Sequence, residues 1–278
     1  MKSLLNKYAF SIWSKYFLTF ISILSFVSWF IPTIPDDKQF LKYIIGISLI
    51  VLSFVSYLII AIYEKSCKKV HLRINNTSVN IIFGDIFDAN GIKVIAFNEY
   101  FDSIVDNEVI NSDSLNGQLF KRINKDDFDL SIINNTSLIK TEENKSRKYG
   151  KKQKYAIGQI HKFNEDYYAL SFSKFNDKNE ACLYSYEYAN CLIEMWKQLN
   201  TYYAQSAINI PLLGDGITRI LNNTTITKQE LLETILETLK ISNITFKNPS
   251  KINIVLWPGN NNENYKCFDF SKIKMMFN

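Results

Sequence analysis

A glycine turn late in the chain has the composition of a phosphate-binding loop. Residues 206–221 read SAINIPLLGDGITRIL: a short apolar strand ends at Pro211, the turn Gly214–Gly216 follows, and a helix-like pattern resumes at Ile217. Glycines let the backbone approach an anion closely, and unpaired N–H groups at a helix start point partial positive charge at it. The turn therefore predicts a phosphate site, although strand-to-helix turns also use glycine for their geometry alone.

Three other polar segments adjoin stretches that we expect to be strands or helices. Gly84-Asp85-Ile86 follows the alternating strand Ser78–Phe83, and Asn98 ends the apolar strand Ile92–Phe97. Ser114–Gly117 reads as a helix start with a second close-approach glycine. Polar residues at strand ends suit a site at the edge of an α/β sheet. Asp85 can equally be a carboxylate that caps a turn, so both interpretations stay open.

Residues typical of catalysis and metal binding are sparse. The chain has two histidines, and its four cysteines form no C-x-x-C pair. No nucleophile stands beside a base in the sequence, so we assign no catalytic residue and no metal ligand. The net charge of +5 is mild and no recognition motif accompanies it, so we expect no nucleic-acid partner.

The elements that would position these segments alternate between strand and helix patterns. Residues 155–161 and 167–172 predict a hairpin, and residues 184–199 predict a long amphipathic helix. Thr227 and Glu230 form a capping box for a helix over 228–239, and 252–256 predict a last buried strand. This order predicts an α/β fold, a three-layer α/β/α sandwich with a mixed sheet.

A basic, polar segment covers Lys140–Lys154. It either contacts anionic lipid, at about 1 kcal/mol per basic residue near a membrane surface, or is a solvated excursion between strands. The sequence leaves both interpretations open.

Two N-terminal stretches have the length and composition of membrane spans. Residues 16–34 and 43–63 carry no charge, and as helices they would measure roughly 28 and 31 Å. We therefore expect a transmembrane hairpin over residues 1–66, with spans at about 13–34 and 43–63, and a cytoplasmic domain over 67–278. Lysines flank both outer ends while the connecting loop is balanced in charge, which places both termini in the cytoplasm.

In order and spacing, the four polar segments resemble the ligand-binding elements of macro domains, which bind ADP-ribose. The run VIAFNEYFDSIVDNEVINSDSLNGQLF, together with IPLLGDGI, is more closely similar to the macro-type domain of the membrane effectors of type II Thoeris, a bacterial antiphage system. Members of that family also carry two N-terminal transmembrane helices, so the resemblance covers nearly the whole chain.

The resemblance implies a ligand site and a role for each segment. Asp85, with the Ile86 backbone beside it, would meet the adenine, Asn98 the distal ribose, and Gly214–Ile217 the diphosphate, with Gly117 opposite. The implied ligand-binding residues are Asp85, Ile86, Asn98, Ser114, Asn116, Gly117, Gly214, Asp215, Gly216 and Ile217.

The resemblance also implies a signal and partners. The ligand would be an ADP-ribose derivative, histidine-ADP-ribose, made by a partner protein with a TIR domain. Glu99, Asp102 or Asn116 are candidates to meet its amino-acid end. Binding would lead to homo-oligomers that disrupt the bacterial inner membrane and cause abortive infection. Two other functions remain as alternatives: a membrane-tethered ADP-ribosyl hydrolase and a membrane scaffold for a partner protein.

Overall fold

The structure, a computed structural model, describes residues 7–28, 39–176, 180–216, 219–221, 226–247 and 251–277. The chain divides into two compact units. The first comprises Met1–Lys68 and Asp269–Asn278, and the second Lys69–Phe268. The predicted boundary after residue 66 lies close to this division. However, the C-terminal residues, predicted to be part of the α/β domain, group with the N-terminal helices.

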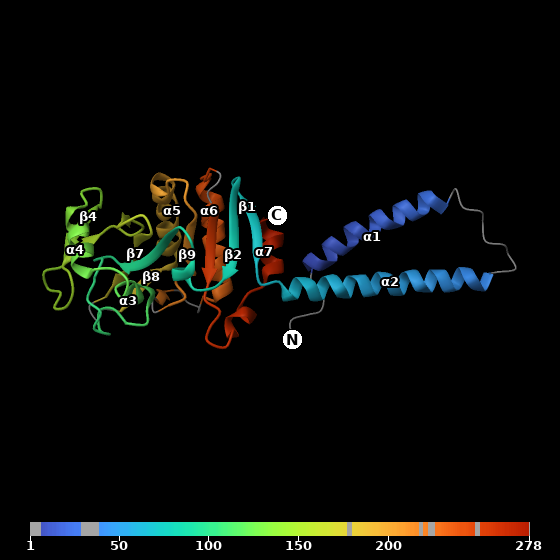
Figure 1. Cartoon of the computed structure of the whole chain (residues 1–278), viewed down its shortest axis with the longest axis horizontal. Helices are drawn as coiled ribbons and strands as arrows, with labels where there is room; N and C mark the ends of the chain where they lie inside the picture. The colour runs from blue at the N-terminus through green and yellow to red at the C-terminus, as the bar shows by residue number, and fades with distance from the viewer. Residues whose placement is uncertain are drawn as a thin grey trace. The chain divides into compact units, whose positions relative to one another are not determined.

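The first unit consists of helices α1 (Lys7–Ser28), α2 (Gln39–Ser66) and α7 (Phe270–Phe277), shown in Figure 1. Trp13 joins α1 to α2, because its indole N–H donates to the Ser53 carbonyl (3.0 Å) and lies 3.1 Å from the Ser56 hydroxyl. Among the described residues, one helix, Tyr43–Glu64, is long and apolar enough to cross a membrane. Residues 29–34 of the predicted first span lie outside the described ranges.

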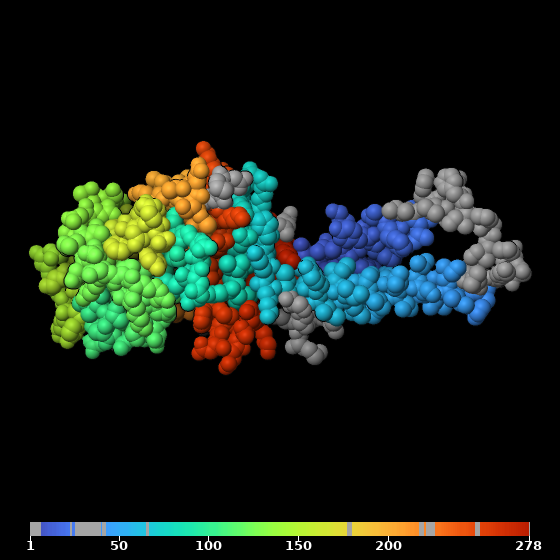
Figure 2. Space-filling model, in the orientation of Figure 1, coloured from blue at the N-terminus to red at the C-terminus, as the bar shows by residue number. Residues whose placement is uncertain are grey.

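Helix α2, drawn in light blue in Figure 2, carries exposed apolar side chains along its length. Ile47, Ile50, Leu52 and Ile59 are each more than 60% exposed. Exposed aliphatic side chains on one long helix are unusual on a surface that faces water, and they are what a lipid-facing helix carries.

Helix α7 packs within the first unit against α1 and α2. Its Ile273 is fully buried, and the Lys274 ammonium lies 2.6 Å from the Glu64 carboxylate near the end of α2. The two side chains are only 14% and 8% exposed. The short C-terminal helix is therefore fixed to the long apolar helix by a buried ion pair.

The second unit is built on a mixed sheet of nine strands among the described residues, with a separate ribbon of β4 and β5. The strand order is β1-β2-β11-β9-β3-β7-β8-β10, and β6 pairs with β7. The strands are β1 (Val70–Ile74), β2 (Thr77–Phe83), β3 (Ile92–Asn98), β4 (Lys140–Glu143), β5 (Gln153–Tyr155), β6 (Ile160–Lys162), β7 (Tyr167–Phe175), β8 (Ala181–Tyr184), β9 (Ile208–Pro211), β10 (Arg219–Leu221) and β11 (Lys251–Leu256).

The five central strands β2, β11, β9, β3 and β7 run parallel to one another, whereas β1 pairs antiparallel with β2, and β6 and β8 pair antiparallel with β7. The carboxyl ends of parallel strands meet at one edge of a sheet. Asn98, Pro211 and Phe175, which end β3, β9 and β7, therefore lie at the same edge.

Helices lie on both faces of this sheet. On one face, α3 (Leu115–Leu119) and α4 (Lys125–Asn134) share a core with β3, where the rings of Phe97 and Phe128 stack at 5.1 Å. On the other face are α5 (Ser185–Tyr202) and α6 (Lys228–Ser242), and Phe172 of β7 meets Tyr188 of α5. The 3₁₀ turns η2 (Ile86–Asp88) and η3 (Glu263–Cys267) complete the unit. This is the layered arrangement that the sequence predicted.

Two local predictions are confirmed and one is wrong. The Thr227–Glu230 capping box begins α6, and residues 155–175 contain the β6–β7 hairpin. The segment after the glycine turn, expected to be a helix, contains the short strand β10, which pairs parallel with β8. An Ile-x-x-Ile spacing over a few residues fits either period, and pairing with an open sheet edge decides the outcome here.

Candidate ligand-binding site

A cavity of about 670 Å³ opens where β3, β7 and β9 end. It contains five of the ten predicted ligand residues: Asn98, Ser114, Asn116, Gly214 and Gly216. The other lining residues are Ala96, Phe97, Asn107, Glu108, Val109, Ile110, Asn111, Asp113, Leu115, Phe172, Ser173, Phe175, Ala181, Pro211, Leu212 and Leu213. The structure thus brings three of the four predicted segments to one place.

The segment Ser114–Gly117 forms one wall. The Ser114 hydroxyl caps α3 by accepting from the Gly117 N–H (3.2 Å), which also lies 3.1 Å from the Asn116 amide oxygen. Gly117 itself is buried behind the wall rather than at its surface. A Cβ on Gly117 would stand 2.3 Å from the Asn111 carbonyl oxygen, so only glycine allows this approach. Gly117 therefore positions the wall from behind.

The glycine turn forms the opposite wall without a helix start. Gly214 has φ of +90°, which glycine adopts without strain. Among the described residues, the backbone N–H groups of Gly214 and Gly216 have no hydrogen-bond partner, so both are available to an anion. Asp215 is not in the lining, because its carboxylate pairs with Lys228 at 2.7 Å. Ile217 lies outside the described residues.

Asp85 and Ile86 do not line the cavity. Asp85 caps η2 by accepting from the Phe87 N–H at 2.9 Å, so the turn-capping interpretation describes its place in the structure. Ile86 is buried in the core beneath α3 and α4. Asp85 nevertheless follows β2 at the carboxyl edge, three strands from β3 in the sheet order. At a strand spacing of about 4.8 Å, this separation is roughly 14 Å.

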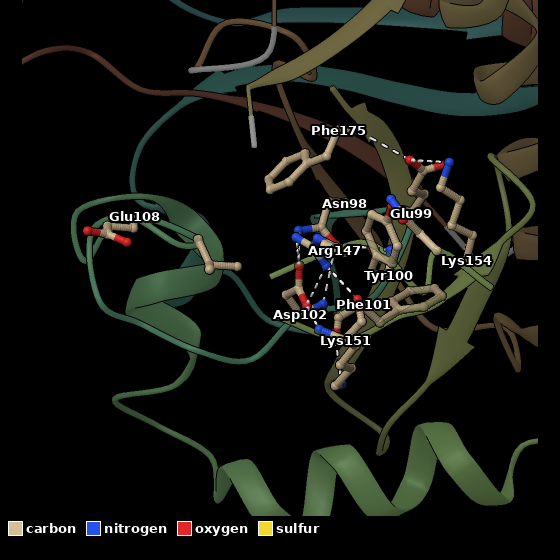
Figure 3. A network of polar contacts seen from close by, with 12 residues as sticks. Asn98, Glu99, Tyr100, Phe101, Asp102, Glu108, Arg147, Lys151, Lys154 and Phe175 are labelled. Atoms are coloured by element: carbon tan, nitrogen blue, oxygen red, sulfur yellow. Dashed lines mark hydrogen bonds and ion pairs between the residues drawn. The ribbon is translucent and has the colours of Figure 1, made fainter. Parts of the chain in front are cut away.

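Asn98 lines the cavity, but its side-chain amide is occupied within the protein (Figure 3). The amide oxygen accepts from the N–H groups of Tyr100 (3.0 Å) and Asp102 (3.3 Å), and the amide nitrogen donates to the Asp102 carboxylate (2.9 Å). Asp102 is fully buried and is not in the lining. The arrangement favours a positioning role for this pair over direct contact with a ligand.

Glu99 points away from the cavity toward β5 and β7. It is 5% exposed, and burial raises the pKa of its carboxyl above the usual range, against the Phe175 N–H (3.2 Å) and Lys154 (3.7 Å) that stabilise the charge. Of the three candidates for the amino-acid end of the ligand, Glu99, Asp102 and Asn116, the structure places only Asn116 in the lining.

Comparisons with known proteins place this geometry in a family. Residues 79–257 match the family described as Thoeris protein ThsA, Macro domain. The chain is also 35% identical over 280 residues to Thoeris protein ThsA of Bacillus amyloliquefaciens strain Y2, covering 98% of this chain and 91% of the relative. The chain belongs to the Thoeris ThsA family. The matched residues include both walls of the cavity and Asp85, so the macro-domain resemblance is confirmed for the second unit.

Two solved structures are similar to this ThsA family member at a low level. One is a mutant of the Oceanobacillus iheyensis macrodomain, at 12% identity and a TM-score of 0.39, covering 76% of this chain and 98% of that one. The other is the same macrodomain with MES bound, at 11% identity and a TM-score of 0.44, covering 75% and 96%.

The sequence did not identify half of the wall in this ThsA family member. The loop Asn107–Asn111 and the end of β7 at Phe172–Phe175 line the cavity, and neither has a motif. The cluster Asp106-Asn107-Glu108 was a usable signal, since polar residues that follow a strand end often lie at an α/β site. Among the described lining residues, the charged ones are Glu108 and Asp113, with no lysine or arginine.

The buried histidine of this ThsA domain lies outside the cavity. His161 is 2% exposed, and its ring nitrogens lie 2.8 Å from the Ser131 hydroxyl and 2.8 Å from the Asn135 amide. Burial, with the charge of Lys151, lowers the pKa of His161 to about 4. A neutral imidazole that joins α4 to β6 is a structural element, and it is not placed to act on a ligand in the cavity.

The depressed pKa of His161 predicts acid sensitivity. The unfolded chain takes up a proton near pH 6.5 and the folded chain only near pH 4, so stability is complete above about pH 6.5 and falls as the pH is lowered through this window. The loss approaches roughly 3 kcal/mol at pH 4. Thermal unfolding from pH 7.5 to 4.5 should show a weaker pH dependence in H161Q, while H71Q, at an exposed position, should follow the native protein. Identical pH dependence in H161Q and the native protein would contradict the assignment.

Proposed function

We propose that this chain is an antiphage defence effector of the type II Thoeris membrane subtype. Its macro domain binds an ADP-ribose-derived signal, the protein then oligomerises, and its N-terminal helices disrupt the inner membrane and cause abortive infection. The proposal takes the chain to be a sensor and not an enzyme, with the signal supplied by a TIR-domain protein.

The single observation that carries the proposal is the cavity between the glycine turn and the Ser114–Gly117 wall. The N–H groups of Gly214 and Gly216, which have no partner among the described residues, suit a diphosphate, because backbone donors in a concave turn bind anions without a basic side chain. Asp85 lies farther along the same sheet edge, where an elongated dinucleotide-like ligand would reach it. A volume of about 670 Å³ is in the range of small-molecule sites.

Two carboxylates in the cavity lining, here called the acidic mouth, favour a ligand that carries a positive charge at one end. Glu108 and Asp113 both line the cavity and are exposed. Carboxylates near a diphosphate repel it unless the ligand also offers positive charge. The α-ammonium group of histidine-ADP-ribose would supply a positive charge beside these carboxylates, so the conjugate should be preferred to ADP-ribose itself.

The membrane part of the proposal rests on α2. Its apolar, outward-facing surface over Tyr43–Glu64 suits a lipid environment, and α1 pairs with it through Trp13. We propose that both helices span the inner membrane, with both termini in the cytoplasm. Signal binding must favour the assembled state, because a ligand with equal affinity for both states shifts no equilibrium.

The test is titration of the full-length protein in lipid nanodiscs with ADP-ribose and with histidine-ADP-ribose. The recovered ligand is analysed by chromatography, and particle mass by light scattering. We expect saturable binding, tighter for the conjugate, with the ligand recovered intact and the mass increased. Consumed ligand would make the protein a hydrolase, and no binding of either compound would contradict the proposal.

A test variant and a control variant show whether the lining carboxylates distinguish the two ligands. The double variant E108Q/D113N should weaken binding of the conjugate by about tenfold while leaving ADP-ribose affinity equal or improved. E165Q removes one carboxylate that is 85% exposed and outside the lining, and it should change neither affinity. If E108Q/D113N loses the same affinity for both ligands, the acidic mouth does not recognise the amino-acid end of the conjugate.

A further inference from the structure

We infer that Arg147 is a positioning residue for the cavity wall formed by Asn98 and Phe175. Arg147 belongs to the strap, the loop Asn144–Lys152 that joins β4 to β5. This inference rests on the proposed function, from which the ligand of the cavity is taken. The sequence offered lipid contact or a solvated loop for this basic segment, and the structure places Arg147 in neither environment: it is 9% exposed and lies against the end of β3.

Arg147 forms an ion pair with Asp102. The guanidinium donates through Nη1 (3.2 Å) and Nη2 (2.7 Å) to the two carboxylate oxygens of the fully buried Asp102. The Lys151 backbone N–H donates to the same carboxylate at 2.7 Å. The strap thus supplies the positive charge and most of the donors that keep this carboxylate inside the protein. A buried carboxylate without them carries a large desolvation penalty.

Asp102 is connected to the cavity through Asn98. Asp102 accepts from the Asn98 amide at 2.9 Å, and the Asn98 amide oxygen accepts from two backbone N–H groups of the turn 98–102. In this turn Phe101 has φ of +50°, which is uncommon for a bulky residue. The conformation of the turn, and with it the Asn98 face of the cavity, depends on the Asp102 carboxylate being held in place.

Arg147 also packs against Phe175, the second residue of this wall. Its guanidinium lies 3.8 Å from the centre of the Tyr100 ring and 5.5 Å from that of Phe175, which lines the cavity (Figure 3). The strap approaches the ion pair closely at Gly150, because a Cβ there would stand 2.7 Å from both Arg147 Nη1 and Asp102 Oδ1. Arg147 therefore reaches Asn98 through Asp102 and contacts Phe175 directly, while it remains outside the lining itself.

Two substitutions at Arg147 test this role in the full-length protein in lipid nanodiscs, with ADP-ribose as the probe. R147K keeps the charge but loses the bidentate geometry and the planar contact with Tyr100. R147M also leaves Asp102 without its counter-charge. We expect ADP-ribose affinity to fall at least threefold in R147K and at least tenfold in R147M. Amide hydrogen exchange at residues 100–102 should be at least tenfold faster in both variants.

Two controls separate positioning from stability. K148M removes one positive charge from an exposed position in the same strap. I81V trims a fully buried side chain of β2 and lowers the melting temperature. Ile81 lies outside the core cluster that contains Phe101, and β11 and β9 separate its strand from β3. Both controls should keep native affinity and native exchange at residues 100–102.

The outcomes are decisive in each case. Native exchange and native affinity in R147K would overturn the inference, as would equal losses of affinity in R147K and I81V. If R147M fails to fold, R147K alone decides. If the native protein does not bind ADP-ribose, the proposed function fails, and the exchange rates at residues 100–102 still decide whether Arg147 holds this wall.

Discussion

Replacing Gly117 with alanine should weaken ADP-ribose binding at least tenfold and lower the stability of the second unit. The added methyl group would stand 2.3 Å from the Asn111 carbonyl oxygen and 2.9 Å from the Ser112 Cα, both backbone atoms that cannot swing aside. Such overpacking typically costs 1–3 kcal/mol, and relief requires the loop that carries Asn111 to move. Because Asn111, Ser114 and Asn116 line the cavity, the movement reaches the ligand. Thermal unfolding and titration calorimetry measure the two effects.

Gly216→Ala is the matched control for this prediction. It makes the same chemical change in the other wall of the cavity, where a Cβ would have no neighbour within 4 Å among the residues that the structure describes. Its stability should equal that of the native protein, and its affinity should fall less than that of G117A. If G117A and G216A behave alike in both measurements, then close approach at Gly117 does not shape the cavity.

Removing the charge of Lys274 should have the second large effect, this time on the helical unit. K274M leaves the Glu64 carboxylate 8% exposed and without its ammonium partner at 2.6 Å. Breaking a buried pair on one side costs about 3–5 kcal/mol. We expect α7 to detach, so that limited proteolysis of the full-length protein in nanodiscs should release the C-terminal segment at least tenfold faster than in the native protein.

Two further variants control for this result. E64Q/K274M removes both charges, and it should recover much of the protease resistance because no uncompensated charge remains. K162M breaks the pair Lys162–Glu165, whose side chains are 35% and 85% exposed, and such a pair contributes about 0–1 kcal/mol. Native resistance in K274M, or equal sensitivity in K274M and E64Q/K274M, would show that the buried pair does not hold α7.

The sequence predicted well those elements whose signals are local. Thr227 and Glu230 lie three residues apart, so one short segment of the sequence is enough to predict their reciprocal capping of α6. The strand Ile92–Asn98 and the long helix α5 follow from apolar periodicity in the same way. Macro-domain membership followed from the order of four short segments, and the family match confirms it.

The sequence did not predict features that depend on pairing between distant residues. Asn98 and Asp102 are close in sequence, but the arginine that holds them comes from residue 147. In the structure, the Asn98 amide, predicted to contact the ribose, donates to the Asp102 carboxylate that this arginine holds. The short strand β10 likewise depends on β8 offering it an edge. The placement of Lys274 beside Glu64 joins residues 210 positions apart, and no periodic signal marks it.

The grouping of α7 with α1 and α2 makes the macro domain an insertion in the covalent sense. The chain leaves the helical unit after Lys68 and returns to it at Asp269, so the domain is joined to the helices by two peptide connections instead of one. A body tied at one point can swivel about any axis, whereas a body tied at two points can rotate freely only about the line that joins them. Severing either connection would therefore remove a restriction that the covalent chain alone imposes on the inserted domain.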